Sequence, residues 1–242
     1  GDIEFIGKDG TKFEPGAENA PYPENTWDAE SKTYTNNATI SGESEDGRGT
    51  GINANAADVT IKNNGMISGT SSNDGYMEYG VKIDALKDME NNGLISATST
   101  YANADTYGIY NSSQKLNNII NNGIIRSVNT NGGQQTYGIS INASMNDIKN
   151  RGLINSNIIS SDYCYSHGIK VLSSMGNIKN SGLINSSTSD SSEESLSTGY
   201  GIDIYSNGSP ITVEEIENSG VIYGHGNAIN KSNKTTVSAA NN

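Results

Sequence analysis

Tyrosines and carboxylates that could recognise a sugar gather in a few polar segments of the chain. The candidate ligand-binding residues are Tyr76, Tyr101, Tyr163, Tyr165 and Asp162. A tyrosine ring can pack on the apolar C–H face of a sugar, while carboxylate and amide groups can hydrogen-bond its hydroxyls. These residues therefore predict ligand binding by loops on one side of the molecule.

Catalytic chemistry has weaker candidates. Carboxylates lie close together at Asp88 with Glu90 and in the run 214–217, and such pairs can act as acid and base. His167 could activate Cys164, three residues before it. Exposed acids on a strand are the commoner meaning of such pairs, and His167 replaces a tyrosine of a repeated motif. We therefore expect no catalytic residue, no enzyme activity and no cofactor.

Composition limits the other classes of site. Cys164 is the only cysteine, which excludes disulfides and a zinc site built on cysteine pairs. The nine-residue calcium-binding repeat is absent, and we expect no metal. A net charge of −12 argues against nucleic-acid binding. Hydrophobic residues make up 33% of the chain, less than the roughly 45–50% of an ordinary globular domain.

A repeat must position these residues. Its first element is aliphatic, any residue, Asn, any residue, Gly, aliphatic, Ile, as in Ile61 to Ile67. It returns five times, at Met89 to Ile95, Ile119 to Ile125, Ile148 to Ile154, Ile178 to Ile184 and Ile216 to Ile222. The glycines follow one another at spacings of 28, 30, 29, 30 and 38 residues, which predicts a repeat architecture.

A second element lies between these copies and reads aromatic, Gly, Ile, any residue, Ile. Tyr137 to Ile141 is a clear example, and a third apolar point such as Leu116 precedes each copy of the first element. Alternation at period two predicts strands. Three short strands cannot form a compact unit alone, but they can when equivalent strands stack. We therefore predict an all-β fold, a parallel β-helix (β-solenoid) of about seven turns of roughly 28–30 residues, with three strands per turn.

The repeated polar positions have structural interpretations. An inward Asn at the same place in each turn predicts a ladder of hydrogen-bonded amides. The ladder residues are Asn63, Asn91, Asn121, Asn150, Asn180 and Asn218. The column that contains Tyr107 predicts stacked rings more strongly than a ligand platform. The glycines provide a positive φ or close approach of backbones at corners.

The chain divides into three predicted segments. Residues 1–35 do not fit the repeat and are expected to be an N-terminal cap or an irregular connection. Residues 36–230 form the solenoid, and residues 231–242 are expected to be a disordered or truncated tail. No apolar run is long enough to span a bilayer, and no signal-peptide pattern opens the sequence.

An apolar stripe accompanies the repeat and would point outward on a regular strand. It consists of Met66, Leu94, Ile124, Leu153, Leu183 and Val221. Because an exposed stripe of this kind would be a large apolar patch, we expect a bend to turn it inward or a loop to cover it. A groove for a partner is the alternative.

The alternation of Ile-x-Asn-x-Gly-x-Ile with Tyr-Gly-Ile-x-Ile over residues 36–230 resembles the passenger domains of large Gram-negative autotransporter adhesins, notably the fusobacterial type. The resemblance implies a secreted, extracellular rod on the bacterial cell surface, a virulence factor in cell adhesion. Its parent would be anchored in the outer membrane by a barrel domain that this chain lacks. No site motif of the family matches, so no functional residue carries over.

Three functions remain open from the sequence. The leading one is an adhesin segment that binds a host or bacterial cell-surface glycan or protein receptor through loops on one face. The second is a non-binding structural stalk of a larger autotransporter. The third is a polysaccharide-degrading β-helix enzyme, which would require clustered carboxylates on one outer face.

Overall fold

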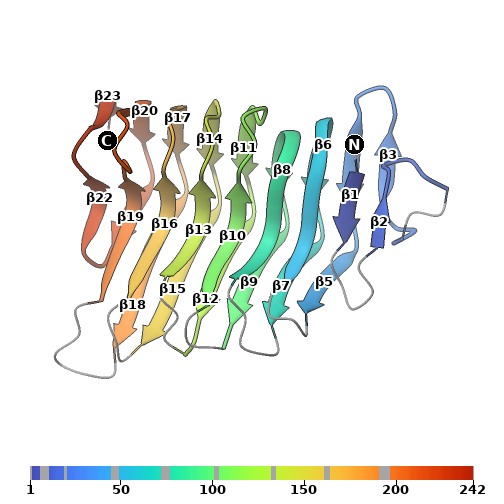
Figure 1. Cartoon of the computed structure of the whole chain (residues 1–242), viewed down its shortest axis with the longest axis horizontal. Coiled ribbons are helices and arrows are strands. Elements are labelled where there is room, and N and C mark those ends of the chain that lie inside the picture. The colour runs from blue at the N-terminus through green and yellow to red at the C-terminus, as the bar shows by residue number, and fades with distance from the viewer. Residues whose placement is uncertain are drawn as a thin grey trace.

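The computed structural model describes residues 2–5, 11–18, 21–44, 49–71, 77–100, 104–131, 135–160, 164–190 and 197–241. Within these ranges every regular element is a strand, and the strands lie side by side along the long axis of a rod (Figure 1). The predicted parallel β-solenoid with three strands per turn is confirmed.

The first strand of each turn belongs to a seven-stranded sheet, so seven layers stack with six steps of the repeat between them. In chain order these strands are β5 (Thr39–Ser44), β7 (Met66–Ser71), β9 (Leu94–Ser99), β12 (Ile124–Asn129), β15 (Leu153–Ser160), β18 (Leu183–Asp190) and β21 (Val221–Gly224).

The second and third strands of each turn, together with the N-terminal strands, form one larger sheet of 16 strands. The second strands are β10 (Asp105–Asn111), β13 (Gln135–Ile141), β16 (Tyr165–Val171), β19 (Thr198–Ile204) and β22 (Asn227–Lys231). The third strands are β11 (Asn118–Asn121), β14 (Asp147–Asn150), β17 (Met175–Asn180), β20 (Ile211–Asn218) and β23 (Thr235–Asn241). In two early turns both strands are continuous, as β6 (Thr50–Asn63) and β8 (Met77–Asn91).

Each strand pairs in parallel with its equivalent in the next turn, in register. Ile109 lies opposite Ile139, and Ile139 lies opposite Ile169. All three are fully buried in one hydrophobic core that runs the length of the rod. Residues that are one repeat apart in the sequence therefore form columns of similar side chains along the rod. Each residue lies about 4.8 Å from the equivalent residue in the next turn.

The asparagines of the first element form the inner ladder. Asn63 Nδ2 donates to Asn91 Oδ1 over 2.8 Å, and the same contact recurs between each pair of neighbours up to Asn180 and Asn218. Asn36 Nδ2 begins the ladder by donating to Asn63 Oδ1. Each amide also reaches backbone carbonyls at the adjoining bend, so its buried polar groups are satisfied within the protein.

Close approach, and not a positive φ, explains the glycine that follows each ladder asparagine. A Cβ on Gly123 would lie 2.2 Å from the carbonyl oxygen of Gly93 in the preceding turn. Among the described glycines, only Gly16 and Gly208 have a positive φ. Any side chain at this column would therefore push the bends of two turns apart.

The N-terminal segment covers the first turn with antiparallel strands. β1 (Asp2–Phe5) pairs with β2 (Thr11–Phe13) and with β6, and β3 (Thr26–Asp28) pairs with β4 (Thr33–Asn36). β4 itself pairs in parallel with β6, so the solenoid pattern already begins within the 1–35 segment. Trp27 packs against the core.

The C-terminal segment, expected to be a disordered or truncated tail, contains a strand. β23 pairs in parallel with β20, and Val237 lies opposite Val213. Residues 235–241 thus continue the third strand of the solenoid. The sequence obscures this because Ala240 lies opposite Ile216, in place of the large aliphatic residue that begins the first element.

The expectation that the apolar stripe is turned inward or covered is wrong for part of it. Ile124 is 41% exposed, Leu183 is 37% exposed and Val221 is 55% exposed. Met66, Leu94 and Leu153 are half-buried. The strand keeps its alternation through this point, which places Ile125 and its equivalents inside and the preceding residue outside.

Candidate functional site

An aromatic stack runs along the second strands, outside the hydrophobic core. The ring centroids of Tyr79 and Tyr107 are 5.2 Å apart, those of Tyr107 and Tyr137 are 4.6 Å apart, and those of Tyr137 and His167 are 4.8 Å apart. The three tyrosines form a cluster of their own with Tyr110. The predicted stack of aromatic rings is therefore present, and most of the ring area is buried by the neighbouring turns.

The regular parallel stacking of rings ends after His167. The ring of Tyr200 is tilted by 37° to the His167 ring, at a centroid distance of 6.0 Å. A hollow of about 350 Å³ lies at this point, and we call it the histidine hollow. It is lined by Gln135, Tyr165, His167, Lys170, Tyr200, Asp203, Tyr205, Asn230 and Ser232.

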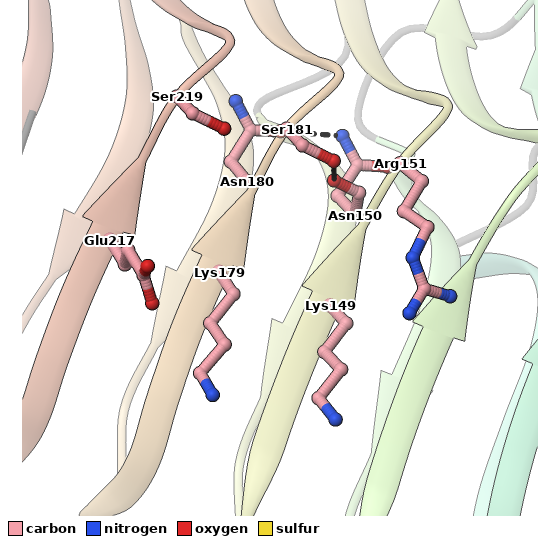
Figure 2. Close-up of a pocket in the computed structure, with 8 residues that line it drawn as sticks. All are labelled: Lys149, Asn150, Arg151, Lys179, Asn180, Ser181, Glu217 and Ser219. Carbon is pink, nitrogen blue, oxygen red and sulfur yellow. Dashed lines mark hydrogen bonds between the residues drawn. The ribbon is translucent and has the colours of Figure 1, made fainter.

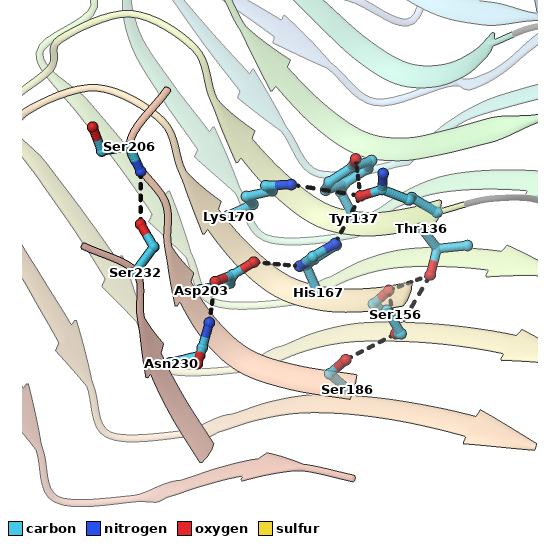
Figure 3. Close-up of polar contacts among 12 residues, drawn as sticks. Thr136, Tyr137, Ser156, His167, Lys170, Ser186, Asp203, Ser206, Asn230 and Ser232 are labelled. Atoms are coloured by element: carbon cyan, nitrogen blue, oxygen red, sulfur yellow. Dashed lines mark hydrogen bonds and ion pairs between the residues drawn. The ribbon is translucent and has the colours of Figure 1, made fainter. Parts of the chain in front are cut away.

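Oxygen atoms flank both nitrogens of the His167 ring. Nε2 lies 3.0 Å from Gln135 Oε1 and Nδ1 lies 3.0 Å from Asp203 Oδ2, although a ring N–H on Nδ1 would not point directly at that oxygen (Figure 3). Burial lowers the pKa of His167, more strongly than the Asp203 carboxylate raises it. A neutral imidazole has one N–H for these two oxygen neighbours, so it can donate to only one of them.

Asp203 is the negative group of the hollow. Burial opposes its ionisation, but contacts with His167, Asn230 and Lys170 outweigh burial and hold its pKa below the usual value. Asn230 Nδ2 donates to Asp203 Oδ1 over 2.9 Å. An ionised carboxylate with a fixed orientation can accept hydrogen bonds from hydroxyl groups.

The Lys170 side chain lies over two tyrosine rings at the hollow. Its Nζ lies 5.5 Å from the ring centroid of Tyr137 and 5.2 Å from that of Tyr205, within the range of cation–π contacts. Burial lowers the pKa of Lys170, against the influence of Asp203 and Asp105. The ammonium group is therefore held between rings, and Tyr205 remains 43% exposed at the rim.

Asp105 occupies the same column as Gln135 and Tyr165, one and two turns before them. Burial raises its pKa to about 6, although a backbone hydrogen bond from Gln135 and the charge of Lys170 act in the opposite direction. Its Oδ1 has no hydrogen-bond partner among the described residues. The charged form of Asp105 is therefore costly in the folded protein.

Of the ligand-binding residues predicted from the sequence, Tyr165 lies in the hollow, with its ring centroid 6.3 Å from that of His167. Tyr76, Tyr101, Tyr163 and Asp162 lie outside the described residues. The structure adds Lys170, Asp203, Tyr205 and Asn230, which we did not predict from the sequence. A signal was present, because Lys170 and Asp203 are opposite charges in adjacent turns of one outward column.

Cys164 does not contact His167. Its Sγ lies 2.9 Å from Ser197 Oγ, whereas both nitrogens of His167 face other residues. Among the described residues, no three His, Cys, Asp or Glu side chains gather closely enough to hold a metal ion. The hollow is thus a set of aromatic rings, one cation, one carboxylate and amides.

Comparison of the chain with known protein families, with curated protein sequences and with solved structures finds no match. No helix in the described part of the chain is long and apolar enough to cross a membrane.

Proposed function

We propose that this chain is a segment of an extracellular bacterial adhesin, a β-helical rod that binds a cell-surface glycan in the histidine hollow. One observation carries the proposal. Tyr165, Tyr200 and Tyr205 offer ring surface around a small space that also holds Asp203, Asn230 and Gln135. Sugars require this combination, since they present apolar C–H faces and polar hydroxyls together. The repeat pattern supports the passenger domain of a Gram-negative autotransporter as the parent.

The fixed geometry of the hollow supports binding. Each lining group is on a strand or directly after one. β16 and β19 have paired neighbours on both sides, and the edge strand β22 pairs with β19. A site on such elements loses little conformational freedom when a ligand binds. The Ser232 hydroxyl accepts a hydrogen bond from the backbone N–H of Ser206 at the rim of the hollow (Figure 3).

A glycan array with purified protein tests the proposal. We expect specific binding that falls about tenfold or more in Tyr205→Ala, because truncation of an aromatic anchor commonly costs more than 1 kcal/mol. Tyr223→Ala is the matched control, because Tyr223 is 48% exposed and lies on β21, outside the hollow. Tyr165→Ala should weaken binding in the same way.

A structural stalk is the second candidate function, and the unbroken inner ladder favours it. A rod with regular spacing and no ligand would give a blank array with folded, β-rich protein. Equal binding by the Tyr205 and Tyr223 variants would remove the hollow from the site.

A further inference from the structure

A second hollow lies on the third strands and the bend after them, away from the histidine hollow. Its volume is about 280 Å³. We call it the basic groove, and it is lined by Lys149, Asn150, Arg151, Lys179, Asn180, Ser181, Glu217 and Ser219 (Figure 2). Three cations and one acid line it, in a chain with 15 Lys and Arg against 27 Asp and Glu.

The repeat forces two of these cations together. Lys149 lies directly opposite Lys179 in the parallel pair of β14 and β17, so their backbones are about 4.8 Å apart. Their side chains point the same way in Figure 2. Like charges directly opposite each other on neighbouring strands destabilise a sheet. An anion placed between the two ammonium groups would remove this repulsion.

Arg151 adds a third cation two residues after Lys149. It replaces an asparagine of a second, exposed ladder, in which Asn122 Nδ2 donates to Asn92 Oδ1 and Asn92 Nδ2 donates to Asn64 Oδ1. Arg151 Nη1 donates to Asn122 Oδ1 over 3.2 Å, which fixes the guanidinium at the end of this ladder. Its remaining N–H groups are available for a planar anion.

The described residues provide little compensation for this charge. Glu217 lies opposite Lys179 in register, but no ion pair within 4.0 Å joins Lys149, Lys179 or Arg151 to an acid in the described part of the chain. The other groups in the groove are hydroxyls and ladder amides. The groove therefore offers mainly hydrogen-bond donors and positive charge.

We infer that the basic groove binds a carboxylate or sulfate group of an acidic carbohydrate. Every residue that lines the groove is polar or charged, whereas a protein partner would require an apolar centre in its interface. The chain's net charge of −12 opposes the long-range attraction that a phosphate backbone requires. A short acidic sugar needs only the local field of three cations.

The test uses a sulfated uronate-containing oligosaccharide of the heparin type, its desulfated form and its carboxyl-reduced form, with affinity measured by calorimetry at low and at physiological ionic strength. We expect at least one charged form to bind, and the affinity to fall as salt rises. Loss of affinity in the desulfated form would identify sulfate as the ligand group. Loss in the carboxyl-reduced form would identify carboxylate.

Matched variants locate the site. The double substitution of Lys149→Gln and Lys179→Gln should weaken binding about tenfold or more, since it removes two charge-assisted hydrogen bonds to the anion. Lys62→Gln should leave affinity unchanged, because Lys62 lies in the same outward column beside Glu90 and outside the groove. Glu217→Gln should strengthen binding a few fold.

Two results would overturn the inference. One is that none of the three charged oligosaccharides binds the folded protein at low ionic strength. The other is an equal loss in Lys62→Gln and the double variant, which would indicate a bulk charge effect. Tyr205→Ala should not change this affinity, so failure of the histidine hollow and failure of the basic groove are distinguishable.

Discussion

The inner asparagine ladder and the outer aromatic stack run along the same turns, but only the ladder stays the same from one end to the other. The ladder links Asn36 to Asn218 with one contact geometry. The stack is regular from Tyr79 to His167 and then tilts at Tyr200. A buried amide that loses its neighbour in the next turn cannot turn to solvent for a replacement hydrogen bond, so the ladder is kept constant. An outer side chain can change, since solvent or a ligand can replace a lost partner.

The two hollows support this distinction. Each lies where a column of the outer surface changes residue type: tyrosine to histidine in the stack, and asparagine to arginine in the exposed ladder. In a stacked repeat, a chemically distinct site therefore arises where an outward-facing column changes residue type while the inward-facing columns keep theirs.

The largest effect is expected from breaking the inner ladder. Asn121→Ala should lower the free energy of unfolding by about 3–5 kcal/mol, because it removes contacts to Asn91, Asn150 and two backbone carbonyls in a buried site. Asn122→Ala in the exposed ladder should cost about 0–1 kcal/mol. Urea denaturation measures both. Similar costs would contradict the contrast between inside and outside.

The aromatic stack should show a smaller contrast of the same kind. Tyr107→Leu should cost about 1–3 kcal/mol, because Tyr107 stacks on rings on both sides. Tyr200→Leu should cost less than about 1 kcal/mol, because its ring is tilted and partly exposed. Thermal unfolding gives the stability order, and the glycan array should give the reverse order for binding. If Tyr200→Leu is the more destabilising change, the regular and open parts of the stack do not differ as proposed.

An effect similar in size to that of Tyr107→Leu concerns Asp105 and has a defined dependence on pH. Its pKa rises from 3.8 in the unfolded chain to about 6 in the folded protein. The folded state therefore binds the proton more tightly, and stability falls as pH rises from about 4 to about 6. Asp105→Asn should stabilise the protein by about 1–3 kcal/mol at pH 7.

This gain should shrink as the pH falls and largely disappear by about pH 3, where Asp105 is mostly protonated in both states. Denaturation curves at neutral pH and at about pH 3 compare the variant with the wild-type protein. A gain that is equal at both values would show that the charge of Asp105 is not its cause.

The sequence was sufficient to predict the solenoid, the strand number per turn, the inner ladder and the stacking of tyrosines. Those features repeat, and a repeated residue such as Asn121 meets its own copies in the turns before and after it. Segments with no copies were predicted less well. The C-terminal strand β23 departs from the motif and was expected to be a disordered or truncated tail. The apolar stripe does repeat, but it was expected to be turned inward or covered by a loop, whereas Val221 is exposed.

The period of the sequence determined which residues share a column, because stacking in register places residues that are one repeat apart next to each other. Only the tertiary structure decided which columns lie beside one another around the turn. Tyr165, His167, Lys170 and Asp203 meet Asn230 in one hollow because β16, β19 and β22 are adjacent on the same outer face. Arg151 completes the basic groove because the bend turns it toward the side of the lysine pair. The distance between side chains of different columns depends on the bends of the backbone and on the directions of the side chains, and the sequence period does not determine either.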